Sequence, residues 1–296
     1  MTDLAQSETE LGESVSLDYE TARGRERRSF IGTLAAMPPW VGSVLGIVII
    51  LIAWQVVAVT FFAVTKSVPQ PGLVFVQLFK DLFTTDVYWN AIAKTGGAAA
   101  WGFLWGNLVA FFLAFLVLLA PWFEGLSTQL AVVCSCIPLT AIAPIVTLLA
   151  PAGSRNTSVI LAALSVIFTT VIGTLLGLRA ASETQLDVIR AYGGSRFTQL
   201  FKVRLIAALP SILAALKLAA PAAFLGAVLG EYFVLGVDQG IGILLLAAQA
   251  TSASVKLWAL ALICAGVAGL AYFLIGRIGR LVAPWSSGDS RAGEGF

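Results

Sequence analysis

Long uninterrupted apolar runs constrain this chain more than any other feature. Hydrophobic residues make up 58% of its 296 residues and charged residues only 11%, whereas a soluble domain carries about 25% charged residues. A bilayer-spanning helix needs roughly 20 apolar residues, and a membrane barrel would instead show alternating strands of roughly 10 residues. The runs here are long and do not alternate. The sequence therefore predicts an all-α membrane protein.

Six apolar runs are long enough to cross a bilayer. They cover residues 40–64, 91–119, 126–149, 158–178, 209–233 and 256–278. A shorter segment, 71–83, has apolar residues at helical spacing and is predicted to be an amphipathic helix at the membrane surface. We therefore divide the chain into a polar, disordered tail over 1–39, a transmembrane domain over 40–285 and a C-terminal tail over 286–296.

Positive charges fix the orientation of these spans. Twelve of the 18 Lys and Arg residues lie in the N-terminal tail, the segment 179–207 and the C-terminal segment from residue 277 onward. With six spans all three segments fall on one side, which the positive-inside rule makes cytoplasmic. We therefore expect both termini and the loop at 182–206 in the cytoplasm. A net charge of +2 gives no reason to expect a nucleic acid partner.

Prolines and polar residues inside the spans are the candidates for a transport pathway. Pro138 and Thr140 lie in a run whose prolines predict an irregular helix, and Pro221 removes a backbone hydrogen bond from the fifth span. Glu231, at the far end of that span, is either an interfacial carboxylate or a group that lines a pore. Histidine is absent and the three cysteines form no metal-binding pattern, so no catalytic, cofactor-binding or metal-binding residue is predicted.

Small residues recur at every fourth position in two of the spans. They are Ala98, Gly102, Gly106, Ala110 and Ala114 in the second span and Ala222, Gly226 and Gly230 in the fifth. Such ridges let neighbouring helix backbones approach closely. Asn107, within the first ridge, is placed to hydrogen-bond across helices.

The loop at 182–206 has helical spacing on both sides of a glycine pair. Gly193 and Gly194 are predicted to end a first helix, and Ser195 to cap a second. We expect two helices joined by a turn, with an apolar edge and a basic edge, projecting into the cytoplasm. Exposed aromatic residues such as Tyr192 and Phe201 are typical of a surface that enters a cleft on another protein. A solvated charged loop is the alternative interpretation.

The stretch DVIRAYGGSRFTQLFKVRLIAALPSILAALKLAA, which begins at Asp187, resembles the coupling loop of ATP-binding-cassette (ABC) importer permeases of the binding-protein-dependent type. Gly193 takes the place of that family's glycine, and Asp187 stands where the family has glutamate. Two alanines of the family pattern are replaced by valine and isoleucine. The segments VPQPGLVFVQL and GEYFVLGVDQGIGILL extend the resemblance over most of residues 68–282, and it is closest to the nitrate/sulfonate/taurine branch.

The resemblance implies the type I ABC importer permease fold, with six transmembrane helices, in the bacterial plasma (inner) membrane. The residues that it implies for contact with a cytoplasmic ATPase are Asp187, Arg190, Ala191, Tyr192, Gly193, Gly194, Ser195, Arg196 and Phe201. The partners would be an ATPase dimer, an identical or homologous second permease and an extracytoplasmic solute-binding protein. The solute would be a small organic anion or a pyrimidine-like compound.

The chain has no P-loop sequence. It would therefore not be an enzyme and would hold no cofactor, since ATP and Mg²⁺ would be bound by the partner ATPase. Two other functions fit parts of the sequence. An ion-coupled secondary transporter would use Glu231 and Lys217 near its pathway and would need no ATP. A non-transporting membrane scaffold would explain the ridges of small residues.

Overall fold

The computed structural model describes residues 39–119, 124–136, 138–151, 153–234, 236–237 and 239–287, and all of the regular structure among them is helical. The chain divides into two compact units, Met1–Pro71 and Gly72–Phe296, which are described separately. The tail predicted to be disordered over 1–39 lies outside the described residues except for Pro39, and so does 288–296 of the C-terminal tail.

The first unit contains helix α2, Pro39–Thr60, which coincides with the first predicted span. Most of its apolar side chains are exposed, for example Ile47 and Ile50, whereas Ala58 is buried. A helix that is hydrophobic all round needs an apolar environment, and a bilayer supplies one. At its C-terminal side the Trp54 indole donates a hydrogen bond to the Pro69 carbonyl oxygen at 3.1 Å.

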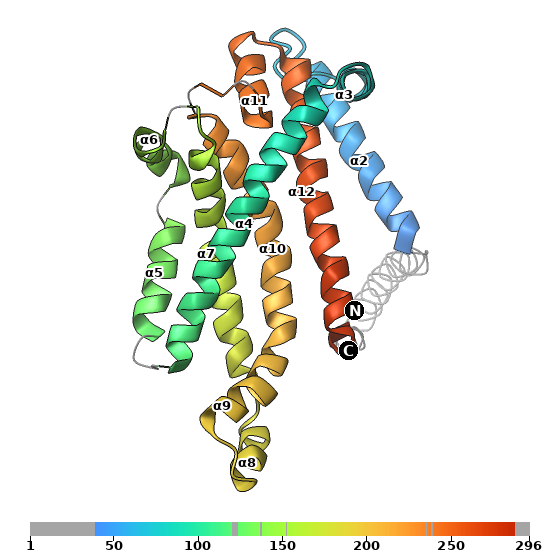
Figure 1. The fold of residues 1–296 in the computed structure, drawn as a ribbon. Coiled ribbons are helices and arrows are strands. Elements are labelled where there is room, and N and C mark those ends of the chain that lie inside the picture. The colour runs from blue at the N-terminus through green and yellow to red at the C-terminus, as the bar shows by residue number, and fades with distance from the viewer. Residues whose placement is uncertain are drawn as a thin grey trace, which may run out of the picture. The chain divides into compact units, whose positions relative to one another are not determined.

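Four long helices lie side by side in the second unit (Figure 1). They are α4 Val87–Leu119, α7 Asn156–Arg179, α10 Leu205–Glu231 and α12 Ser254–Val282. Among the described residues these four and α2 are the helices long and apolar enough to cross a membrane. They confirm five of the six predicted spans, each with somewhat different ends.

The predicted span at 126–149 is instead two shorter helices, α5 Glu124–Cys136 and α6 Leu139–Leu149. Pro138 stands at the start of α6 with φ −59° and ψ 122°, an extended conformation that cannot continue a helix. Its carbonyl oxygen accepts the first hydrogen bonds of α6, from the amides of Ala141 and Ile142. A single helix over 126–149 was therefore the wrong expectation, although the irregularity predicted from its prolines is confirmed.

Helix α7 lies between α4 and α10, and the two predicted ridges of small residues make this possible. An added Cβ at Gly102 of α4 would overlap Ala162 of α7, and one at Gly226 of α10 would lie 2.7 Å from Ser165 Oγ. Larger residues would force the helices apart. The predicted role of both ridges in helix packing is confirmed.

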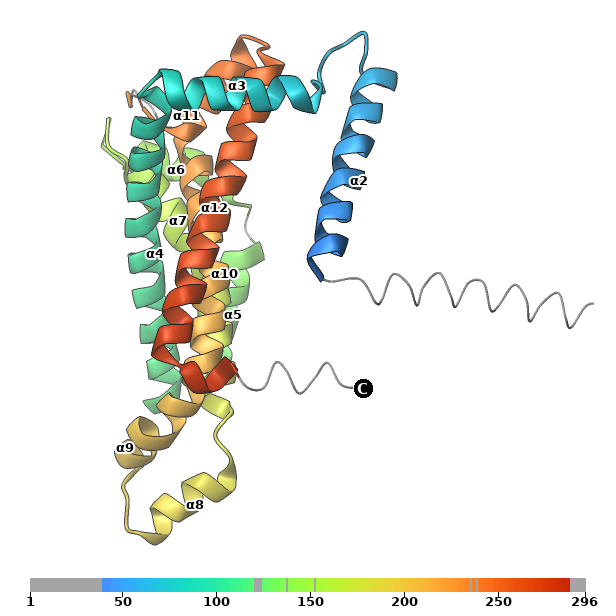
Figure 2. The same ribbon diagram turned by 90° about the vertical axis from the view of Figure 1, so that its right-hand side faces the viewer.

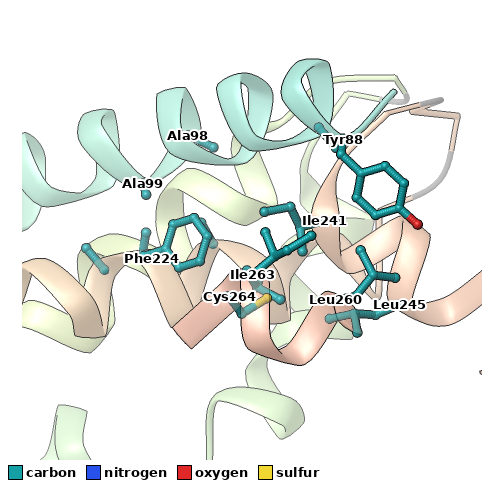
Figure 3. Close-up of a cluster of buried hydrophobic side chains, with 14 of the residues drawn as sticks. Tyr88, Ala98, Ala99, Phe224, Ile241, Leu245, Leu260, Ile263 and Cys264 are labelled. Atoms are coloured by element: carbon teal, nitrogen blue, oxygen red, sulfur yellow. The ribbon is translucent and has the colours of Figure 1, made fainter. Parts of the chain in front are cut away.

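Buried side chains form two clusters along the bundle. The first contains residues of α4, α10, α12 and α11, Ile241–Ala250, and Figure 3 shows Phe224, Ile241 and Leu260 meeting there. The second joins Ala110 and Ala114 of α4 to Val171 of α7 and neighbouring residues of α7 and α10. The Thr170 hydroxyl donates to Asn107 Oδ1 at 2.6 Å, which is the cross-helix hydrogen bond predicted for Asn107.

The two ends of the bundle differ. Helix α3, Pro71–Thr84, lies across the end of the bundle at which α11 also lies, whereas α8, Glu183–Ala191, and α9, Arg196–Gln199, project from the opposite end (Figure 2). Helix α3 matches the predicted amphipathic helix, and its residues Leu73, Val76 and Phe79 remain exposed. The short helix η3, Pro284–Ser287, follows α12 at the end from which α8 projects.

Candidate functional site

The projecting segment begins with a helix whose start is closed by two reciprocal hydrogen bonds. Ser182 Oγ accepts from the Gln185 amide at 3.3 Å, and Gln185 Oε1 accepts from the Ser182 amide at 3.3 Å. This is a capping box, which satisfies two backbone donors at once. Leu186 is 1% exposed and anchors α8, so the helix has a fixed start and one buried contact.

The glycine pair ends α8 in a Schellman motif, as predicted. The Gly194 amide donates to the Ile189 carbonyl oxygen at 2.8 Å and the Gly193 amide to that of Arg190 at 2.9 Å. Gly193 has φ +71°, in the left-handed region that favours glycine. At Gly194 an added Cβ would lie 2.8 Å from the Ile189 carbonyl oxygen. The turn therefore needs glycine at 193 for its left-handed backbone conformation and at 194 for the close approach of the Ile189 carbonyl oxygen.

Two features connect this turn to the membrane helix. Ser195 Oγ accepts from the Thr198 amide at 3.3 Å, so it caps α9 as predicted. The next five residues, Leu200–Arg204, form a single π-helical stretch called η2, closed by a bond from the Leu205 amide to the Leu200 carbonyl oxygen. Helix α10 follows directly. The chain is therefore helical without interruption from α9 to Glu231. No sequence pattern had indicated the π-helical stretch.

The tip of the projection presents apolar side chains to its surroundings. Tyr192 is 89% exposed, Phe197 61% and Phe201 57%. Beside them Arg190 Nη1 and Asp187 Oδ1 form an ion pair at 2.8 Å in which both side chains are largely exposed. Exposed pairs of this kind contribute little to stability. The tip combines a fixed backbone with an exposed aromatic surface, which suits contact with another molecule.

Eight of the nine residues predicted to contact an ATPase lie in the stretch from α8 to the start of α9, and Phe201 follows in η2. Asp187, Arg190, Ala191, Gly193 and Ser195 are exposed and Gly194 is half-buried. Arg196 opens α9, and its side chain lies outside the described part of the chain.

The four predicted pathway residues occupy different environments. Pro138 and Thr140 are exposed at the start of α6, and Pro221 is half-buried within α10, which continues through it. Glu231 is 2% exposed at the end of α10. These positions leave the pathway assignment of all four residues a prediction.

Glu231 has hydrogen-bond partners on three other segments. The Thr95 hydroxyl of α4 donates to its Oε1 at 2.9 Å, and Arg155 Nη1 forms an ion pair with the same oxygen at 3.1 Å. The Gly242 amide donates to Oε2 at 2.8 Å. Gly242 lies in the first turn of α11, so the carboxylate caps that helix where negative charge is favoured.

Two further contacts complete this cluster, which we call the Glu231 cluster: Thr95, Arg155, Glu231, Gln239, Gly240, Ile241 and Gly242. Thr95 Oγ1 accepts from the Ile241 amide at 2.9 Å, and Arg155 Nη2 donates to the Gln239 carbonyl oxygen. An added Cβ on Gly240 would lie 2.5 Å from the Glu231 carboxylate. The carboxylate therefore joins α4, the start of α7, the end of α10 and the start of α11.

Sequence reasoning identified Glu231 but missed Thr95, Arg155 and Gly240. Thr95 and Glu231 are 136 residues apart, and no local pattern connects them. The available signal was that Arg155 is a charged residue immediately before a span, opposite in charge to a carboxylate at the end of another. Among the described residues no group of three His, Cys, Asp or Glu side chains could hold a metal ion.

The bundle and its two differently built ends define a multi-pass, all-helical integral membrane protein with a helix–turn–helix attached to one spanning helix. A family model described as "Binding-protein-dependent transport system inner membrane component" matches residues 106–287, and the chain belongs to that family. The resemblance found in the sequence is thereby confirmed. The protein is the membrane translocation subunit of an ABC importer and lies in the inner membrane.

Three relatives agree with this assignment. A "Probable ABC transporter permease protein" of Haemophilus influenzae is 29% identical over 77% of this chain and 90% of its own. A "Putative aliphatic sulfonates transport permease protein SsuC" of Bacillus subtilis is 26% identical over 83% and 88%. A "Riboflavin transport system permease protein RibX" of Chloroflexus aurantiacus is 24% identical over 84% and 91%. Like other permease subunits, the chain is not an enzyme, and its family works with ATPases and binding proteins.

Proposed function

We propose that the segment 182–206 couples this permease to a cytoplasmic ATPase dimer, and that a second permease, identical or homologous, completes the translocation pathway. The observation that carries the proposal is the tip of the projection, where exposed Tyr192 and Phe197 flank a turn held in a Schellman motif. Aromatic side chains on a rigid backbone lose little entropy when they dock in a cleft. ATP and Mg²⁺ would be bound by the ATPase.

The unbroken helix above the turn gives this contact a mechanical consequence. The apolar helical stretch Phe197–Glu231 contains 35 residues, which corresponds to a length of roughly 50 Å at 1.5 Å per residue. Its far end is tied to α4, α7 and α11 through the Glu231 cluster. A displacement of the tip by the ATPase would therefore reach the opposite end of the bundle through one continuous element.

The solute that we propose is a small organic anion, with a pyrimidine-like compound as the second candidate. Support comes from the branch of the family that the sequence resembles and from the sulfonate named for the Bacillus subtilis relative. Pro138, Thr140 and Pro221 remain our candidates for the pathway. Three donors hold the Glu231 carboxylate, namely the Thr95 hydroxyl, Arg155 and the Gly242 amide. We therefore expect it to shape the pathway by fixing the corner between α10 and α11.

An ion-coupled secondary transporter remains the alternative that the experiment must separate from an ATP-driven one. Such a carrier would move solute in vesicles that contain only this chain and an ion gradient. Membership of the family favours dependence on ATP. We therefore expect uptake only when the ATPase, ATP and the binding protein are present.

The test replaces Gly193 by valine in the full complex. Gly193 has φ +71°, and a left-handed conformation costs an L-residue roughly 1–2 kcal/mol, with a β-branched residue at the upper end. If docking needs this turn, the fraction of complexes coupled to ATP hydrolysis should fall about tenfold for each 1.4 kcal/mol of strain. The measurement is co-purification of the ATPase together with permease-dependent ATP hydrolysis.

Gly266→Val is the matched control. A Cβ atom added at Gly193 or at Gly266 would have no neighbour within 4 Å. The two positions differ in backbone conformation, because Gly193 has a positive φ and Gly266 does not. The control should retain ATPase binding and coupled hydrolysis. Equal behaviour of the two variants would show that the turn does not couple the subunits.

A further inference from the structure

One charged side chain lies near the middle of a spanning helix. Lys217 follows the start of α10 at Leu205 by twelve residues and precedes its end at Glu231 by fourteen. These intervals correspond to about 18 Å and about 21 Å along the helix. Since the hydrocarbon core of a bilayer is about 30 Å thick, Lys217 lies near the middle of the membrane, far from the headgroups on either side.

The Lys217 side chain packs between α10 and α12. Its Nζ lies 4.3 Å from the centre of the Tyr272 ring, and a Cβ added at Gly276 would lie 3.0 Å from its Cε. Tyr272 precedes Gly276 by one turn of α12 and so lies farther from the end of the bundle at which α8 projects (Figure 1). Aromatic side chains of a helix point back toward the helix N-terminus. The ammonium is therefore held at mid-depth, whereas lysines near helix ends extend to the headgroups.

No carboxylate among the described residues forms an ion pair with Lys217. The five helices that are long enough to span a membrane contain a single carboxylate, Glu231 at the end of α10, and it is already paired with Arg155. An identical second permease would bring the same residues and therefore no counter-ion at the depth of Lys217. The ammonium lacks a negative partner that this chain could supply.

The backbone presents a second polar group at the same level. Pro221 follows Lys217 by four residues and has no amide hydrogen, so the Lys217 carbonyl oxygen lacks the hydrogen bond that an α-helix would give it. Lys217 is half-buried and Tyr272 is 40% exposed, so this level of the bundle is open on one side. Freed carbonyls and ionisable side chains inside membranes are tolerated where they face protein or a water-filled cavity. The surroundings of Lys217 therefore suit a hydrated pathway better than hydrocarbon.

We propose that the Lys217 ammonium binds the acid group of the transported anion midway along the pathway, while its contact with the Tyr272 ring holds it in place. The inference rests on the function proposed above, in which the solute is a small organic anion, and it names a residue that selects this solute. A lipid headgroup does not reach mid-depth, and the chain provides no counter-ion there. An ammonium is a compact charge with three hydrogen-bond donors, which suits the oxygens of a sulfonate or carboxylate.

The test measures uptake of radiolabelled ethanesulfonate by vesicles that contain the permease, the ATPase and the binding protein. Lys217→Met should lower uptake about ten- to hundredfold, as expected for the loss of one hydrogen bond to a charged group. Lys217→Arg, which keeps the charge, should retain more uptake than Lys217→Met. Lys256→Met is the matched control, because Lys256 also lies over a tyrosine ring, that of Tyr88 at 5.9 Å, but is exposed near the start of α12. It should keep its uptake.

Chemical restoration of the charge separates solute binding from a structural role. Lys217→Cys is made in a chain whose own three cysteines are replaced by alanine. Aminoethyl methanethiosulfonate then attaches a cationic group at this position, and methyl methanethiosulfonate attaches a neutral one. We expect the cationic reagent to recover most of the uptake and the neutral reagent to recover none. The amount of ATPase and of second permease that co-purifies shows whether each complex is intact.

The outcomes separate this inference from its alternatives. Unchanged uptake in Lys217→Met, or equal recovery with both reagents, overturns it and leaves the proposed function intact. A cysteine at 217 that reacts with neither reagent also overturns it, because Lys217 would then face hydrocarbon. Loss of the second permease from the Lys217→Met complex overturns it in favour of a contact between permeases. If the unaltered complex takes up a neutral pyrimidine and no organic anion, the proposed solute is wrong and the inference with it.

Discussion

The continuous helix from α9 to Glu231 follows an exposed turn that is held by backbone hydrogen bonds. At its other end a buried carboxylate is held by two side chains and one backbone amide from three other segments. Each end also carries an ion pair between an arginine and a carboxylate. The pair at the tip, Asp187 with Arg190, is formed by two residues three apart and is open to solvent. The pair in the Glu231 cluster joins residues 76 apart and has a carboxylate that is 1% exposed.

The comparison teaches what each end is built to do. Local hydrogen bonds keep the shape of the tip, so the tip can dock on a partner as a preformed surface. Long-range bonds at the other end fix the corner between α10 and α11 to α4 and α7. The same helix therefore has one end suited to contact with another protein and one end suited to resist displacement.

The largest loss in the free energy of unfolding is expected from Glu231→Ala. Removing one partner of a buried pair leaves a charge and several donors uncompensated, which costs about 3–5 kcal/mol when both partners are fully buried. Since the Arg155 side chain is 24% exposed, we expect a loss near the lower end, about 3 kcal/mol. The measurement is thermal unfolding of the purified chain in detergent. A loss as small as that of an exposed pair would contradict the comparison.

A smaller loss is expected from Gly240→Ala. The added Cβ would lie 2.5 Å from the Glu231 carboxylate, and overpacking of this kind costs typically 1–3 kcal/mol. Gly97→Ala is the matched control, because an added Cβ there meets nothing within 4 Å. Thermal unfolding should separate the two variants. If both behaved alike, the close contact between Gly240 and the carboxylate would not constrain the corner.

The smallest loss in the free energy of unfolding is expected from Asp187→Asn. The pair that it removes is exposed and local, and such pairs contribute about 0.2–1 kcal/mol. We expect no measurable change in the unfolding temperature, and a change in ATPase binding only if Asp187 itself contacts the ATPase. A stability loss comparable to that of Glu231→Ala would mean that the tip is held by charge rather than by its backbone.

The sequence predicted the features that depend on local pattern. Five of the six spanning helices predicted from hydropathy are confirmed. Spacing predicted the ridges that contact α7, and the glycine pair with Ser195 predicted the turn and the cap of α9. Each of these follows from residues close together in the chain. Of the six predicted spans only the third, 126–149, failed, because the effect of Pro138 on the backbone outweighed the apolar composition of its neighbours.

The sequence did not predict the features that depend on distant residues. The Glu231 cluster combines Thr95, Arg155 and Gly240 with a carboxylate that lies far from all but Gly240 in the sequence. Hydropathy and periodicity describe which face of a helix is apolar, but they do not say which helix faces which. The π-helical stretch was also missed, since its residues have an ordinary helical pattern.

The unbroken helix between the tip and the Glu231 cluster has a consequence for how this chain can vary in length. In an α-helix each residue turns the chain by about 100°, so one residue inserted or deleted between Leu205 and Glu231 would rotate the tip by that angle about the helix axis. The tip would then face a different side of the bundle. A π-helical turn absorbs one extra residue without such a rotation. Single-residue length differences among related chains should therefore be tolerated at Leu200–Arg204 and excluded from the rest of the helix.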